Sequence, residues 1–179
     1  MLSGELYLAS DPELVQARQR ASHLIRLYNN TYEDQGQQRY DLLKELLGRV
    51  GSQVNITPPF YCDYGSHILL GERFYSNFGC VILDCHWVEI GDDVLLAPYV
   101  QIYAAYHPTD PQLRLTGQEL AGSVKIGNNV WIGGGAIITQ GVTIGDNTTI
   151  GAGSVVVKDI PANVIAVGNP CRVIRQIAG

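Results

Sequence analysis

Charged residues and long apolar runs are both scarce in this chain. Only 16% of its 179 residues are charged, the net charge is −5, and no basic stripe is present that would neutralise phosphates, so nucleic acid is not an expected partner. No run approaches the roughly 18 apolar residues of a membrane span, and the N-terminus lacks the basic and apolar regions of a secretory signal. We therefore expect no membrane association, and one large domain or one domain with a small appendage.

Cysteine and histidine are equally sparse, with four residues of each. The cysteines form neither a CxxC pair nor the tight framework of a disulfide-rich chain; they are Cys62, Cys80, Cys85 and Cys171. Reduced thiols in a cytoplasmic protein are the simplest interpretation, and a secreted fold stabilised by disulfides is not expected.

The most informative feature of the sequence is a six-residue repeat near the C-terminus. An aliphatic residue recurs at every sixth position, and the residue two places before it is small or β-branched each time. The aliphatic positions are Ile126, Ile132, Ile138, Ile144, Ile150 and Val156. A period of six fits neither an α-helix nor a flat strand, and hexapeptide repeats are typical of a parallel β-helix. Three extended hexads, each about 20 Å long, can wrap one triangular coil with both repeated positions pointing inward.

The same six-residue spacing occurs earlier in the chain, before a long interruption. The earlier positions are Leu70, Ser76, Ile82, Val88, Val94 and Val100, and Ile90, Leu96 and Ile102 follow two residues behind the last three. Ile102 lies four hexads before Ile126, but residues 104–123 between them carry no hexad pattern. We expect these residues to form one long excursion loop that leaves the solenoid wall and returns in register. Loops of this length are usually functional or disordered.

The first fifty residues have helical spacing instead of hexads. Ser10 followed by Glu13 is consistent with a capping box, and apolar residues then follow a helical period. A second helix is predicted over residues 37–47, with Gly48 as its stop signal. The expected organisation is a helical N-terminal cap over residues 1–52 and a β-helix domain over residues 53–179, which includes loop 104–123 and a short C-terminal segment.

His107 stands at the base of the long loop, where the regular scaffold is interrupted. Scaffolds present reactive groups on loops, and an imidazole is the natural general base for a hydroxyl. A second possibility is a zinc hydratase like the γ-class carbonic anhydrases, in which three histidines converge on the metal across a subunit interface. His67, His86 and His107 are the candidates, but their spacings of 19 and 21 residues do not match that class. A third possibility is a non-catalytic solenoid scaffold.

Several motifs occur in the order typical of one enzyme family. They are GELY near the start, PPFYCDYG at 58–65, YSNFGCVILD at 75–84, HP at 107–108, VWIGGGAII at 130–138, GVTIGDNTTIGAGSVVVKDIP at 141–161 and GNPCRVIR at 168–175. Over essentially its whole length the chain resembles the sugar O-acetyltransferases, the maltose, galactoside and nodulation-type members of the hexapeptide acyltransferases. The resemblance implies a mainly β fold, a left-handed parallel β-helix with a small helical cap, and a homotrimer with active sites at subunit interfaces. It also implies direct transfer of acetyl from acetyl-CoA to a hydroxyl of a sugar or sugar-like acceptor, without a metal.

The resemblance assigns roles to particular residues. His107 matches the general base that deprotonates the acceptor, and Asn77 matches the residue that stabilises the oxyanion. The positions that match acceptor contacts are Arg18, Asp63, Tyr75, Asp84, Cys85 and Glu119. The positions that match coenzyme A contacts are Gly134, Ala152, Val157, Lys158, Arg172 and Arg175, of which the basic side chains suit phosphate groups.

The chain departs from the family pattern where the acceptor would bind. Leu8 and Ala9 follow Tyr7 where an aspartate is common, and Cys85 stands where the galactoside-type enzyme has a second aspartate. Losing carboxylates should weaken the binding of a polyhydroxylated acceptor. We therefore expect an acceptor that is more apolar than maltose or a galactoside, or different in another way, while the use of acetyl-CoA is unaffected.

Overall fold

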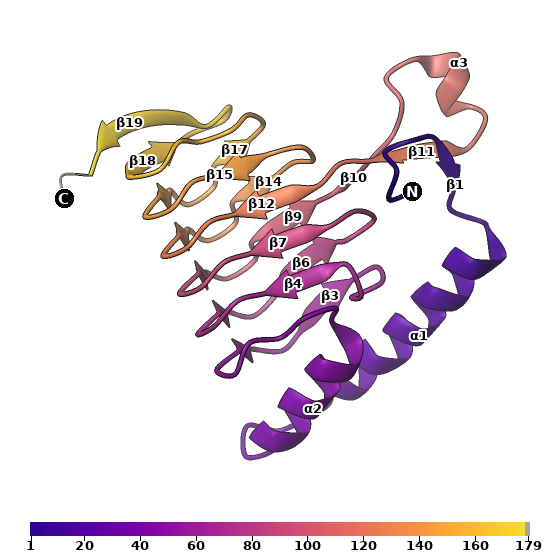
Figure 1. Ribbon diagram of the computed structural model, residues 1–179, viewed down its shortest axis with the longest axis horizontal. Helices are drawn as coiled ribbons and strands as arrows, with labels where there is room; N and C mark the ends of the chain where they lie inside the picture. The colour runs from indigo at the N-terminus through magenta and orange to yellow at the C-terminus, as the bar shows by residue number, and fades with distance from the viewer. Residues whose placement is uncertain (178–179) are drawn as a thin grey trace.

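The computed structural model describes residues 1–177, and its main body is a parallel β-solenoid with two helices at one end (Figure 1). The strands stack into three parallel sheets, which we name the β4, β5 and β6 faces. The β4 face contains β4 (Ile68–Leu70), β7 (Val88–Ile90), β12 (Val124–Ile126) and β15 (Thr143–Ile144). The β5 face contains β2 (Asn55–Ile56), β5 (Tyr75–Ser76), β8 (Leu95–Leu96), β13 (Trp131–Ile132), β16 (Thr149–Ile150) and β18 (Val164–Val167), with β19 (Arg172–Gln176) added antiparallel. The β6 face contains β3 (Phe60–Cys62), β6 (Cys80–Leu83), β9 (Gln101–Tyr103), β14 (Ile137–Ile138) and β17 (Val155–Val156). The predicted mainly β, parallel β-helix fold is confirmed.

The hexad positions form the core of the solenoid. All six aliphatic positions from residue 126 to residue 156 are at most 3% exposed, and the small residues two places before them are buried as well. Ile126 pairs in register with Ile90 on one side and with Ile144 on the other, so equivalent side chains stack in columns. Successive coils approach so closely that a Cβ on Gly133 would lie 2.5 Å from the backbone N of Ala152. Each coil therefore buries its interior against its neighbours, as expected of a solenoid.

The corner between the β4 and β5 faces is built from asparagines. Asn129, Asn147 and Asn163 have φ values of 53°, 56° and 60°, in the left-handed region that asparagine tolerates better than most residues. Their side-chain amides form a ladder in which each Nδ2 donates to the next Oδ1, at 2.9 Å in both steps. These hydrogen bonds tie successive coils together at the corner.

The first helix, α1 (Pro12–Asn29), begins one residue later than a Ser10 cap would place it. The N-cap is Asp11, whose carboxylate accepts from the Glu13 N–H at 3.0 Å, and Pro12 occupies the first helical turn. The capping box predicted at Ser10 is therefore wrong. Asp11 is the N-cap because its carboxylate accepts a hydrogen bond from a free N–H of the first turn. It also places Pro12 at the first helical position, where proline is favoured.

The second helix, α2 (Gly36–Leu46), ends just before the predicted boundary. Leu47 has extended backbone angles and donates to the Leu43 carbonyl, so the helix stops before Gly48 is reached. Gly48 is required for packing, since a Cβ there would lie 2.2 Å from the Ser66 carbonyl oxygen. Residues of both helices share one continuous hydrophobic core with the solenoid strands. The proposed division near residue 52 stays a prediction.

The segment between β9 and β12 leaves the solenoid as a folded excursion (Figure 1). It contains β10 (Ala105–Tyr106), a short helix α3 (Pro111–Arg114) and β11 (Gln118–Ala121). β11 pairs antiparallel with β10 and with β1 (Tyr7–Leu8) from the N-terminus. The chain then returns in register, with β12 beside β7. None of the helices within residues 1–177 is long and apolar enough to cross a membrane.

Candidate active site

The two edges of the β6 face organise the candidate site. We call the side where its strands begin the entry edge and the side where they end the exit edge, because parallel strands share both. Asn77, Gly134 and Ala152 come just before β6, β14 and β17, so they lie at the entry edge. Cys85 and Lys158 come just after β6 and β17, so they lie at the exit edge.

Asp63 and His107 also belong to the exit edge. Asp63 directly follows β3, and His107 follows β10, which continues from the end of β9. The four residues of β6 span about 13 Å at about 3.3 Å per residue. Asn77 and His107 therefore lie on opposite sides of this face. The structure does not bring the two predicted catalytic residues together within one chain.

Three of the predicted acceptor residues form a cluster at the exit edge with a tyrosine. The Arg18 guanidinium of α1 donates to the Tyr64 hydroxyl at 2.8 Å and to the Ala9 carbonyl at 2.6 Å. The Cys85 thiol faces the Asp63 carboxylate, with Sγ 3.4 Å from Oδ2. Helix α1, the turn after β3 and the turn after β6 therefore converge on one place.

Glu119 joins this cluster through the excursion. The Tyr7 hydroxyl of β1 donates to the Glu119 carboxylate of β11 at 2.9 Å, and Tyr7 and Glu119 are register partners. Tyr7, Tyr64, Cys85 and Ala121 are buried together beneath the cluster. Tyr7 and Tyr64 were not predicted as site residues, although they belong to the motifs GELY and PPFYCDYG. Their presence in these family motifs was the signal that could have indicated them.

Burial sets the protonation of the cluster. It raises the pKa of the Asp63 carboxyl above its usual range and raises the pKa of the Cys85 thiol to about 12. A thiol with such a pKa stays protonated at neutral pH and is a weak donor rather than a nucleophile. Cys85 therefore places a small neutral group beside the Asp63 carboxylate.

Asp84 was predicted to contact the acceptor, whereas every polar contact of its side chain in the described chain is with His67 or the protein's own backbone. Its side chain is fully buried, and its carboxylate accepts hydrogen bonds from the backbone N–H groups of Asp63, Tyr64 and His67 at 3.1, 2.8 and 3.2 Å. The His67 ring also lies against it, with Nδ1 2.7 Å from the Asp84 carbonyl oxygen. Asp84 thus holds the turn that carries Asp63 and Tyr64.

Replacing Asp84 by alanine is expected to destabilise the protein by at least about 2 kcal/mol, because buried backbone N–H groups would lose a charged acceptor. Equilibrium unfolding in urea would measure the loss. The matched control is Glu89→Ala, which removes an exposed carboxylate 3.6 Å from Lys125 and should change the unfolding free energy by less than about 1 kcal/mol. Equal, small effects of the two substitutions would contradict the structural role of Asp84.

The remaining acceptor and catalytic candidates lie apart from the cluster. Tyr75 points outward from β5, where it pairs with Leu95. The Asn77 side-chain oxygen accepts from the Phe78 N–H at 2.8 Å, and within residues 1–177 the amide nitrogen has no hydrogen-bond partner. Asn77 therefore keeps an N–H donor at the entry edge. The His107 side chain is exposed and is not hydrogen-bonded to any described residue.

The predicted coenzyme A residues divide between the two edges and the last strand. In the described part of the chain, the backbone N–H groups of Gly134 and Ala152 donate no hydrogen bond at the entry edge. Val157 and Lys158 are exposed at the exit edge. Arg172 and Arg175 are exposed on β19, and neither forms an ion pair with a described carboxylate. The end of the solenoid thus offers free N–H donors and three basic side chains, Lys158, Arg172 and Arg175.

No group of three or more histidine, cysteine, aspartate or glutamate side chains among residues 1–177 is arranged to hold a metal ion. His67, His86 and His107, the candidates for a zinc hydratase, do not form such a group within the chain. His67 instead packs between Tyr64 and Trp87, with ring centroids 5.4 Å from each. The three candidate histidines therefore lie in different surroundings and do not meet at one place within residues 1–177.

Comparison with known proteins identifies the family. The family model of the maltose acetyltransferase hexapeptide capping motif matches residues 1–51, and that of the bacterial transferase hexapeptide with six repeats matches residues 123–158. Nodulation protein L of Rhizobium meliloti is 51% identical over 97% of this chain and 94% of its own length. The crystal structure of a maltose O-acetyltransferase from Clostridium difficile 630 has a TM-score of 0.98 and 57% identity, covering 99% of this chain and 95% of that one. A galactoside acetyltransferase in complex with coenzyme A has a TM-score of 0.96 and 44% identity, covering 98% and 88% of the two chains. This chain therefore belongs to the hexapeptide-repeat O-acetyltransferases of the maltose, galactoside and nodulation type.

Proposed function

We propose that this enzyme transfers the acetyl group of acetyl-CoA directly to a hydroxyl of a sugar or sugar-like acceptor, with His107 as general base, in a homotrimer. The observation that carries the proposal is the division of site residues between the two edges of the β6 face. The exit edge carries His107 and the cluster of Arg18, Asp63, Tyr64, Cys85 and Glu119, which we call the acceptor cluster. The entry edge carries Asn77 and the free N–H groups of Gly134 and Ala152.

A closed ring of identical subunits joins these two halves. In a head-to-tail ring each subunit presents one edge to the next subunit and receives the opposite edge from the previous one. The outward side chains of the β5 face support such contacts, because Leu95 and Trp131 are in-register neighbours and are 47% and 54% exposed. The β4 face instead presents Glu89 and Lys125 outward, as a solvated face would.

The chemistry then follows from the groups at each edge. The imidazole of His107 accepts the proton of the acceptor hydroxyl as the oxygen attacks the thioester carbonyl carbon. The amide N–H of Asn77 donates to the oxyanion of the tetrahedral intermediate. The intermediate collapses as the C–S bond breaks, and the imidazolium returns its proton to the sulfur of coenzyme A.

The donor is held by the rest of the solenoid. The free N–H groups at Gly134 and Ala152 suit amide carbonyls of the pantetheine arm, and the exposed side chain of Val157 offers an apolar contact at the opposite, exit edge. Lys158, Arg172 and Arg175 suit the phosphates, because their cationic groups are not neutralised by described carboxylates.

A thiol-release assay with acetyl-CoA tests the function. We expect coenzyme A to be released with at least one class of acceptor in a panel of mono- and disaccharides, aminosugars, simple alcohols and amines. Amines distinguish O- from N-acetylation, and the simple alcohols test whether Ala9 and Cys85 have shifted the preference away from sugars. Release without acceptor dependence, or with amines alone, would contradict the proposal.

A further inference from the structure

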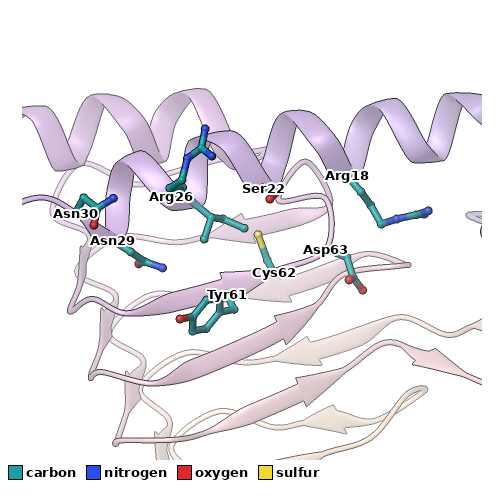
Figure 2. Close-up of a pocket in the computed structure, with 9 residues that line it drawn as sticks. Arg18, Ser22, Arg26, Asn29, Asn30, Tyr61, Cys62 and Asp63 are labelled. Carbon is teal, nitrogen blue, oxygen red and sulfur yellow. The ribbon is translucent and has the colours of Figure 1, made fainter.

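A groove of about 500 Å³ runs between α1 and β3, beside the acceptor cluster (Figure 2). Arg18 and Asp63 stand at one end, and Asn29, Asn30 and Tyr61 stand at the other. Ser22, Ile25, Arg26 and Cys62 line the stretch between. The volume lies within the usual range of small-molecule sites. Because two acceptor-site residues form one end of the groove, a single elongated ligand can occupy both.

Three of the polar side chains along this groove are free. In the described part of the chain, the Ser22 hydroxyl, the Asn30 amide and the Tyr61 hydroxyl make no hydrogen bond with the protein. Asn29 differs, since its amide bonds both the N–H and the carbonyl of Phe60 at 2.9 Å and is therefore occupied. The groove thus keeps several unpaired donors and acceptors within reach of a ligand.

An aromatic surface accompanies these polar groups. Tyr61 lines the groove and is 51% exposed, so its ring is accessible to a ligand there. Cys62, the next residue of β3, also lines the groove, and its thiol is neutral because burial raises its pKa well above the usual value. An open aromatic ring flanked by hydroxyl and amide groups is suited to a sugar ring, which has apolar faces and hydroxyls that both donate and accept.

We propose that this groove binds the second sugar unit of a disaccharide or longer acceptor, while the unit to be acetylated lies at Arg18 and Asp63. The inference rests on the acetyltransferase function proposed above and specifies its substrate class. Binding of the second unit by Tyr61 compensates for the carboxylates that Ala9 and Cys85 do not supply at the first unit. The acceptor specificity of the enzyme is then set largely by contacts with the second sugar unit, and less by contacts with the unit that is acetylated.

The test compares kcat/KM for matched pairs: glucose with maltose, galactose with lactose, and N-acetylglucosamine with its β-1,4-linked dimer. We expect the wild-type enzyme to favour the disaccharide of at least one pair by about tenfold, the equivalent of about 1.4 kcal/mol. Tyr61→Ala should remove most of this preference through a higher KM for the disaccharide, with the monosaccharide unaffected. Tyr32→Ala is the matched control, because Tyr32 is 76% exposed and does not line the groove.

Equal kcat/KM values within every pair would overturn the proposal, as would a Tyr61→Ala loss that is the same for both members. If no acceptor in the panel is acetylated, the proposed function fails separately. Calorimetric titration of wild-type and Tyr61→Ala proteins with the three disaccharides then tests sugar binding in the groove independently of acetyl transfer. Binding that is weakened in Tyr61→Ala supports the site, and the absence of disaccharide binding overturns it.

Discussion

Replacing His107 by alanine is expected to lower kcat by about 10²–10⁴-fold, the usual contribution of general acid–base catalysis. The effect should fall on kcat, because the exposed His107 imidazole takes the hydroxyl proton in the proposed reaction. Arg18 and the neutral Cys85 thiol are both poor bases at neutral pH. The fold should be unaffected, since the His107 side chain is exposed and not hydrogen-bonded within the described chain.

The measurement pairs steady-state kinetics with calorimetric titration of acetyl-CoA. The dissociation constant for acetyl-CoA should stay within about twofold of wild type. His23→Ala is a suitable control, because His23 is an exposed histidine on α1 whose ring is hydrogen-bonded to Arg26. Turnover near the wild-type rate in His107→Ala would mean that the base lies elsewhere.

The solenoid could be predicted from sequence because one period carries two kinds of information. The hexad specifies which side chains point inward, and it also specifies which residues stack on the next coil. Ile126 illustrates both, being buried and in register with Ile90, 36 residues earlier, across the aperiodic excursion. Features that do not repeat were harder to predict from the sequence. The N-cap of α1 is an example, because Ser10 and Asp11 are both suitable cap residues and the structure has Asp11 there.

The site was harder to predict because its contacts join distant parts of the chain. The hydrogen bond from Tyr7 to Glu119 links residues 112 positions apart, and that from Arg18 to Tyr64 links residues 46 apart. Similarity to a family motif indicates which residue occupies a position, but it does not indicate which groups the side chain contacts. Asp84 lies in such a motif, yet its carboxylate turns inward to backbone N–H groups.

The excursion is the part for which the sequence supplied the least. Without a periodic pattern, residues 104–123 were expected only to form a loop. In the structure, β10 and β11 form a hairpin because β11 finds a second partner in β1, which adds hydrogen bonds from the N-terminus. This pairing brings Glu119 to the acceptor cluster. The family resemblance indicated Glu119 as an acceptor residue, but no local signal in the sequence indicated the pairing of β11 with β1.

Mixed trimers provide the sharpest test of the divided site. Asn77→Ala should lower activity by about 10²–10³-fold, as loss of an oxyanion donor does, and His107→Ala should be at least as inactive. When the two variants are unfolded together and reassembled at equal amounts, activity should return to about one quarter of wild type. In the proposed head-to-tail ring, each site takes its exit edge and its entry edge from different subunits, and each edge is intact with a probability of about one half.

The control for this recovery mixes His107→Ala with Asp63→Ala. Both residues lie at the exit edge, so every exit edge in the mixed trimers carries one of the two defects. No activity beyond the average of the two variants is then expected, whatever the mixing ratio. Recovery in the first mixture and not in the second would locate Asn77 and His107 on different subunits of one active site. Failure of the first mixture would contradict the shared site, because two intact edges would have met without restoring catalysis.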